Sequence, residues 1–173
     1  DVTNRSGLLA SLDNNTTDMV IMGKPPKGHN VIATRFMNNP LVVIAAPSHP
    51  LAKQKKVIPL RDLADEPFIV RERQSGTRIA AEKFFAVHDM QLKAGMEMNR
   101  SEAIKQAVMA GLGISYFSSL TVRHEVETGR LVRLKVKGVG LRRTFFLVRL
   151  RHKKETTSLR NFIGFAQGWS APK

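Results

Sequence analysis

Short apolar segments separated by helix-like segments are the feature that most constrains the fold of this chain. The apolar segments are DMVIM at 18–22, LVVIAA at 41–46, FIV at 68–70 and ISYF at 114–117. Runs of this length without polar alternation are typical of strands that a sheet buries on both faces. Because helical patterns lie between them, we predict an α/β fold with mostly parallel sheets.

The helical segments have recognisable starts and stops. Ser6 and Ser101 are placed to cap helices, and Gly111 and Gly129 to end them. The expected helices cover residues 6–15, 77–88, 101–111, 119–128 and 157–167, with a helical turn at 60–64. Further strands are expected at 131–136 and 144–150, and one that ends at 96–98, where both methionines are predicted to be core residues.

Length and composition exclude several classes of protein. The 173 residues suit one domain or two small lobes, and the absence of cysteine excludes disulfides and thiolate metal sites. The five histidines are scattered, so we expect no metal and no cofactor. The sequence shows neither a signal peptide nor an apolar run long enough to span a membrane, so a cytoplasmic location is expected.

The charge is the most informative part of the composition. There are 28 Lys and Arg against 14 Asp and Glu, a net charge of +14. Residues 130–154 hold ten of the basic residues and no acidic one. Val132, Leu134 and Val136 alternate with basic residues there, as in a half-buried strand, so a solvated face is the simplest interpretation. The lack of acids still indicates an anionic partner.

Candidate binding residues lie where helices are expected to begin. In open α/β sheets the ligand sits at the carboxyl ends of the strands, near helix N-termini that attract anions. Each of these junctions carries an arginine, which favours a phosphate or a carboxylate, although simple helix capping would also place hydroxyl residues there. The residues are Asn4 and Arg5, then Gln74, Ser75, Gly76, Thr77 and Arg78, then Asn99, Arg100 and Ser101.

Catalytic motifs are not evident, and we expect that the chain is not an enzyme. The glycines at 111 and 113 end a helix and precede a strand, the reverse of the order used for dinucleotide binding. Ser115 lacks the glycine frame of a hydrolase nucleophile. Glu72 is more simply an ion-pair partner of a neighbouring arginine than one of a pair of catalytic carboxylates.

Several of these segments resemble the effector-binding domain of LysR-type transcriptional regulators. The resemblance rests on DMVIM, on NPLVVIAAP at 39–47, and on HPL, LRDLA, SGTR, EAI and VMAGLGI further along the chain. The stretches MGKPP at 22–26, FIVRE at 68–72 and GMEM at 95–98 are similar to those of CbbR-type regulators, which control Calvin-cycle operons. Together the matches run over nearly the whole chain in the family's order.

The resemblance implies two lobes like those of periplasmic binding proteins. Lobe I would comprise residues 1–38 and 142–173, lobe II residues 39–141, and the crossing strands 40–46 and 144–150. The family's winged helix-turn-helix, its linker helix and the opening strand and helix of lobe I are absent from this sequence, so an N-terminally truncated lobe I is expected. The family places the three junctions around one effector cleft, with Gly23 and Lys24 at its floor.

The expected function is therefore sensing of a small anionic metabolite, without any covalent chemistry. A sugar phosphate, a phosphorylated acid or a nicotinamide nucleotide would suit the arginines. The resemblance implies that effector binding controls transcription of carbon-fixation genes. The resemblance implies a homodimer or tetramer, promoter DNA bound through the missing N-terminal domain, and no membrane. Two alternatives stay open, a basic domain that binds nucleic acid directly and a solute-binding protein for transport. The sequence names neither the effector nor the operator, nor does it separate activation from repression.

Overall fold

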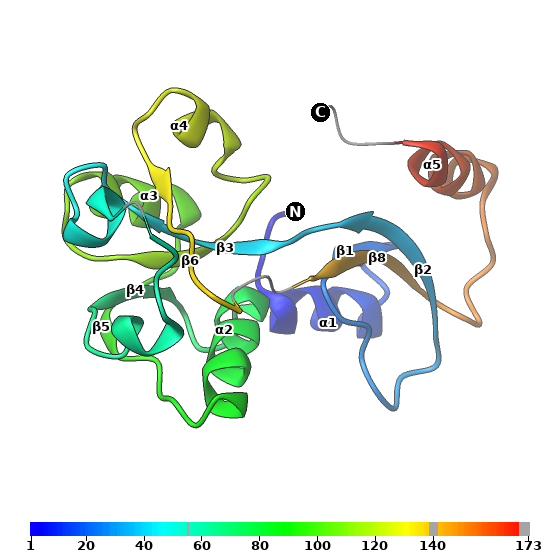
Figure 1. Cartoon of the computed structure of the whole chain (residues 1–173). Helices are drawn as coiled ribbons and strands as arrows, with labels where there is room; N and C mark the ends of the chain where they lie inside the picture. Colours follow the sequence, from blue (N-terminus) through cyan, green and yellow to red (C-terminus); the bar gives the residue numbers. More distant parts are fainter. Residues whose placement is uncertain (55, 139–141, 170–173) are drawn as a thin grey trace. The chain divides into compact units, whose positions relative to one another are not determined.

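The structure is a computed structural model that describes residues 1–54, 56–138 and 142–169. The chain divides into two compact units, Asp1–Asn39 with Arg143–Lys173, and Pro40–Arg142 (Figure 1). The lobes expected from the sequence have boundaries one residue away from these.

Unit 1 is a three-stranded sheet with a helix packed on one face (Figure 1). Its elements are α1 (Arg5–Asp13), β1 (Val20–Met22), β2 (Val31–Asn38), β8 (Thr144–Leu150) and α5 (Thr157–Gly168). The strand order is β1-β8-β2, and both pairings are antiparallel. Leu12 of α1 packs against Val20, Met22 and Val148, while Ile21 points to the other face and stays 39% exposed.

Unit 2 contains the most deeply buried strand of the chain. Its elements are β3 (Leu41–Ala45), the 3-10 turns η1 (Pro50–Lys53) and η2 (Leu60–Leu63), β4 (Phe68–Arg71), α2 (Gly76–Val87), β5 (Ala94–Met98), α3 (Ser101–Met109), β6 (Ser115–Ser118), α4 (Arg123–Glu127) and β7 (Val132–Arg133). Every residue of β3 is buried, and alternate side chains enter two separate apolar clusters. This confirms that the LVVIAA segment is covered on both faces.

The prediction of mostly parallel sheets is wrong. β3 pairs antiparallel with β6 and β7, and only β4 and β5 form a parallel pair. Hydrophobic patterns report burial but not strand direction, because a strand covered on both faces has the same pattern in either orientation. The parallel pair is nevertheless important, since it places the carboxyl ends of β4 and β5 at one edge.

Other differences from the sequence predictions have local causes. The strand β2 was not expected, because its sequence VIATRFMN mixes polar residues with apolar ones and is only half buried. The helix expected at 119–128 is shortened to α4 because residues 119–122 form turns. β7 has two residues where 131–136 were expected, although Val136 still forms a bridge to Ile58. Met96 was expected in the core but is 38% exposed, on the open side of β5.

The turn before β6 requires glycine. Gly113 has φ +155, and a Cβ there would lie 2.4 Å from the carbonyl oxygen of Pro67. The backbone approaches closely because Ile114 donates its N–H to that same oxygen and bridges to Phe68. We therefore expect Gly113→Ala to lower the free energy of unfolding by about 1–3 kcal/mol from backbone strain, with the steric clash added to it. Urea denaturation measures the loss. Gly111→Ala is the comparison, because Gly111 has φ +80 but a Cβ there meets no atom within 4 Å, so this variant carries the backbone strain without the clash.

A buried ion pair joins two helices of unit 2. Lys105 on α3 donates to Glu125 on α4 at 2.6 Å and contacts the exposed Glu102 at 2.8 Å. The bond to Lys105 lowers the pKa of Glu125 despite burial. Burial by itself would lower the pKa of Lys105, but its bonds to the two carboxylates outweigh burial and raise that pKa. The pair therefore keeps both groups charged inside the unit.

Candidate functional site: paired loops at strand ends

The loop after β4 is a tight turn that leads directly into α2. Ser75 donates its backbone N–H to the carbonyl of Glu72 at 2.9 Å, and its hydroxyl accepts from the N–H of Thr77 at 3.3 Å. Ser75 is therefore the N-cap of α2, and its side chain is buried. The helix begins at Gly76, one residue before the start expected from the sequence. Because the Ser75 hydroxyl caps α2, the groups of this loop that remain available to a ligand belong to the neighbouring residues.

Arg71 connects this loop to the start of α3. Its Nη1 donates to the hydroxyl of Ser101 at 3.0 Å, while Nε and Nη2 form a two-point contact with Glu72 at 2.8 and 3.0 Å. The connection is possible because β4 and β5 run parallel, with Arg71 paired to Met98. The structure thus brings two of the three predicted junctions, residues 74–78 and 99–101, to one edge of unit 2.

The side chain of Arg78 is fixed by ion pairs and a hydrogen bond within unit 2. Its guanidinium contacts Glu82 at 2.6 Å and Glu97 at 2.5 Å, and it donates to the carbonyl of Arg71 at 3.0 Å. The bond to Glu82, joined by the bond to Glu97, raises the pKa of Arg78 against the effect of burial. Because two carboxylates already neutralise it, Arg78 ties α2 to β5 and offers less free charge than the sequence suggests.

The unpaired cations of this edge are other arginines. Counting the first turn of α3, four arginines (71, 73, 78 and 100) and four glutamates (72, 82, 97 and 102) give 4 − 4 = 0, and Glu102 is paired with Lys105. Within the described residues, neither Arg73 nor Arg100 forms an ion pair, and both are exposed. Arg100 and the exposed Asn99 lie directly before α3. Arg73 is a candidate that the sequence analysis did not single out, although it lies in the same loop.

The start of α3 differs from the prediction in a way that favours a ligand. Ser101 was expected to cap the helix, but Arg100 is the N-cap residue and makes no side-chain capping bond. The hydroxyl of Ser101 instead accepts from Arg71. The first backbone N–H groups of α3 therefore receive no capping side chain, and an anion is well placed to accept from them.

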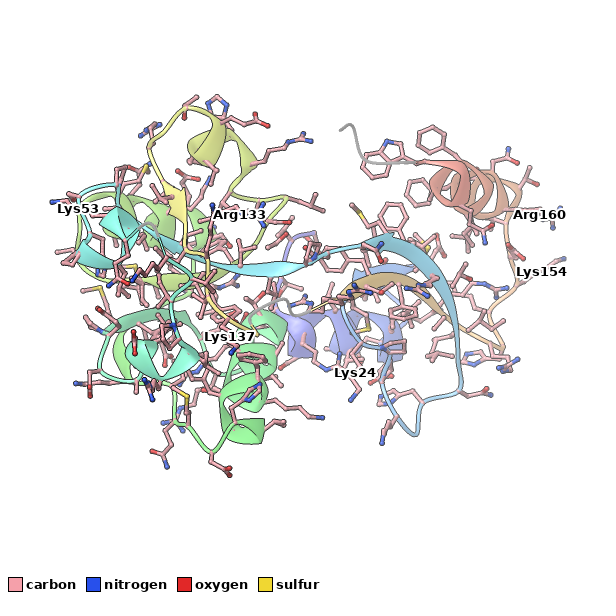
Figure 2. The ribbon with its side chains drawn as sticks, in the orientation of Figure 1. Lys24, Lys53, Arg133, Lys137, Lys154 and Arg160 are labelled. Atoms are coloured by element: carbon pink, nitrogen blue, oxygen red, sulfur yellow. The ribbon has the colours of Figure 1, made fainter. Side chains whose placement is uncertain are left out.

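Unit 1 brings its own predicted residues together. Asn4, rather than Ser6, is the N-cap of α1, and its Oδ1 accepts from Gly7 N–H at 3.1 Å. Arg5 donates to the carbonyl oxygen of Lys24 at 2.5 Å, which joins the first turn of α1 to the loop after β1. Asn4, Arg5, Gly23 and Lys24 therefore lie around one point of unit 1, where Figure 2 labels Lys24.

Arg143 is a further residue at this point that the sequence analysis did not identify. A Cβ on Gly23 would lie 2.7 Å from Arg143 Nη2, so the guanidinium packs directly on the glycine backbone. It also lies over the ring of Phe145, 5.5 Å from the centroid, and burial lowers the pKa of Arg143. The contact joins residues 120 positions apart in the chain, which no local pattern could show.

These loops offer recognition groups and no evident catalytic apparatus. Among the described residues there is no cluster of three histidine, aspartate or glutamate side chains that could hold a metal ion. In the part of the chain that the structure describes, no helix has the length and apolar character to cross a membrane. Arginines, amides and uncapped helix N–H groups bind anions by hydrogen bonds and charge. The fold and the site thus define a small-molecule-binding domain of the α/β class.

Comparison with known proteins places the chain in a family. It belongs to the LysR substrate binding domain family, whose model matches residues 1–171. A RuBisCO operon transcriptional regulator of Allochromatium vinosum is 51% identical over 154 residues, covering 89% of this chain and 51% of the relative. Another, of Acidithiobacillus ferrooxidans, is 44% identical and covers 98% of this chain and 55% of the relative. The chain thus spans about half the length of these relatives.

Solved structures agree with the family. The regulatory domain of Synechocystis PCC6803 CcmR in complex with 2-PG matches with a TM-score of 0.90 and 35% identity, covering 96% of this chain and 80% of that one. The effector-binding domain of QuiR with shikimate matches at 0.83 and 24% identity, over 95% and 77%, which supports the fold alone. The predicted family and two-lobed fold class are confirmed. The matched relatives are transcriptional regulators, and this confirms the prediction that the chain is not an enzyme.

Proposed function

We propose that the chain senses a small phosphorylated acid and thereby controls transcription of carbon-fixation genes. The observation that carries the proposal is the edge of unit 2, where the loop before α2 and the uncapped start of α3 are joined by the bond from Arg71 to Ser101. Arg73 and Arg100 supply positive charge beside it. The relative CcmR was solved with 2-PG, and 2-phosphoglycolate carries the phosphate and carboxylate that such an edge suits.

Both units contribute to this proposal. Asn4, Arg5, Gly23 and Lys24 of unit 1, with Arg143, would serve the same ligand as Gln74, Ser75, Gly76, Thr77, Arg78, Asn99, Arg100 and Ser101 of unit 2. Binding would act by population shift, because the ligand favours the arrangement in which both units reach it. A ligand that prefers one state 100-fold shifts the balance by at most ~2.7 kcal/mol.

The remaining parts of the regulator are proposed on the same basis. The chain would work in the cytoplasm as part of a homodimer or tetramer. Promoter DNA would be read by a helix-turn-helix domain of the whole regulator. A transport protein that binds solutes is the alternative with the same fold, and it would bind its ligand without any effect on a promoter.

The experiment is a ligand panel read by calorimetry and thermal melting. It compares 2-phosphoglycolate with glycolate, inorganic phosphate, shikimate and a nicotinamide nucleotide. At 100 times the Kd a ligand stabilises the folded state by about 2.7 kcal/mol, which for a chain of this size raises Tm by roughly 5–10 °C. We expect this shift for 2-phosphoglycolate and for neither of its fragments. A panel in which glycolate or shikimate binds as tightly contradicts a site for phosphorylated acids.

The carboxylate of Glu97 should oppose an anionic ligand. It faces the ligand edge from β5 and is half exposed, and it pairs with Arg78, which Glu82 also holds. Glu97→Gln removes one negative charge while Glu82 keeps Arg78 in place. We expect 2-phosphoglycolate to bind about 2–5-fold more tightly, the size of one partly screened charge interaction. Calorimetry measures the change, with the exposed Glu127→Gln on α4 as the charge-matched control. An equal gain in both variants would assign the effect to net charge instead.

A further inference from the structure

The basic run at 130–154 separates into two parts with different surroundings. In unit 1 several of its cations are engaged within the unit: Arg149 pairs with Glu155 at 3.4 Å and Lys153 with Asp18 at 2.8 Å. Arg151 donates to the side chain of Asn30 at 3.1 Å. After residue 143, two of the four cations of the run are therefore paired with carboxylates and a third with a neutral amide, while Lys154 forms no ion pair among the described residues.

The part in unit 2 is not neutralised in this way. Arg133, Lys135 and Lys137, here called the basic strand, are exposed, while the intervening Leu134 and Val136 are buried. Within the described residues, none of the three cations has an ion pair or a side-chain hydrogen bond. Four other cations of this unit are paired, namely Arg61, Arg71, Arg78 and Lys105, whereas Arg73 and Arg100 form no ion pair within the described residues.

The backbone holds the basic strand in a fixed row. Leu134 donates to the carbonyl of Val43, and Ile58 donates to Lys135 and accepts from Lys137, at 2.8–2.9 Å. Side chains two residues apart on an extended strand are roughly 6.6–6.8 Å apart on the same face. Val57, on the paired segment, is 59% exposed and brings no negative charge to this surface. Figure 2 labels Arg133 and Lys137 at the two ends of this segment.

We propose that the basic strand contacts the phosphate backbone of double-stranded DNA, independently of base sequence. A row of unpaired cations on a rigid edge fits a linear array of phosphates and needs little ordering on binding. The row contains no aromatic side chain, which argues against stacking on the bases of single strands. The basic strand shares no residue with the proposed effector site, so either proposal can be contradicted without affecting the other. In the whole regulator this contact would add affinity beside the DNA-reading domain.

The test is binding of a labelled random-sequence duplex to this chain, followed by fluorescence anisotropy from 50 to 200 mM salt. The probe variant is R133Q/K135Q/K137Q. The control is K53Q/K83Q/K93Q, which removes the same charge from exposed lysines elsewhere in unit 2. Three phosphate contacts change the slope of log K against log salt by about 2.7, which over this range corresponds to a factor of about 40.

We expect the probe variant to lose that slope and the control to retain it, while both melt and bind 2-phosphoglycolate like the unmodified chain. Equal losses in the two variants would show that only overall charge matters and would overturn the proposal. So would tighter binding to phosphatidylserine vesicles than to DNA, since it would assign the basic strand to a membrane surface. A probe variant that binds DNA like the unmodified chain would overturn it as well.

Discussion

Replacement of Lys105 by alanine is expected to lower the free energy of unfolding by about 3–5 kcal/mol. The variant leaves the carboxylate of Glu125 buried between α3 and α4 without its cation, and Oε2 of that carboxylate already lacks a hydrogen-bond partner. An unpaired carboxylate inside the protein lowers the free energy of unfolding far more than the loss of the attraction between Lys105 and Glu125 does. Urea denaturation followed by circular dichroism measures the loss.

A double variant separates the two contributions. Lys105→Met with Glu125→Leu removes both charges and leaves apolar side chains of similar length between the helices. We expect it to be within about 1 kcal/mol of the unmodified chain or more stable, because buried ion pairs contribute little once their desolvation is counted. A double variant as unstable as Lys105→Ala would show that the pair itself stabilises the fold.

The same pair gives unit 2 a defined pH dependence. The pKa of Glu125 is lowered in the folded state, chiefly by the bond to Lys105. Its contribution is therefore complete above the unfolded pKa of about 4.3 and is lost as the pH falls through the lower folded value. The raised pKa of Lys105 has the opposite effect, with a loss as the pH rises above about 10.4. Stability attributable to the pair should be constant between these limits, and Glu125→Gln should reduce the acid-side slope.

Replacement of Arg100 by alanine is expected to weaken 2-phosphoglycolate binding by roughly 10–150-fold. The figure follows from one charge-assisted hydrogen bond of about 1.5–3 kcal/mol. Arg100 is exposed at the uncapped start of α3, so its removal should leave the Tm of the free chain unchanged. Lys93→Ala is the control, since Lys93 precedes β5 whereas Arg100 follows it. Equal weakening in the control, or none in Arg100→Ala, contradicts the assigned site.

Arg78→Ala should behave differently from Arg100→Ala. The sequence presents Arg78 as an anion-binding residue. In the structure it holds Glu82, Glu97 and the carbonyl of Arg71 together. We therefore expect its removal to lower Tm as well as affinity for 2-phosphoglycolate. Comparison of the two variants then distinguishes a residue that contacts the ligand from one that holds the site in place.

The sequence predicted those features that depend on local pattern. The strand at 41–46 could be found because every side chain in it is apolar. Asn4 was named as a site residue, but its capping role was assigned to Ser6, since both residue types cap helices equally well.

Long-range contacts account for what the sequence could not predict. The bond from Arg71 to Ser101 depends on β4 and β5 lying parallel, and the packing of Arg143 on Gly23 joins distant strands. The sequence also does not show whether a basic side chain is paired with a carboxylate. Arg78 and Lys137 are both basic residues, yet carboxylates hold the first and none holds the second within the described residues.

The most direct measurement is the change in backbone amide NMR signals when 2-phosphoglycolate is titrated into the isotopically labelled chain. We expect the largest shifts at residues 73–78 and 99–102 of unit 2, together with residues 4–5 and 23–24 of unit 1, all saturating with one Kd. Shifts confined to a single unit would contradict a ligand shared by both. Shifts centred on residues 133–137 would place the anion on the basic strand and overturn the assigned site.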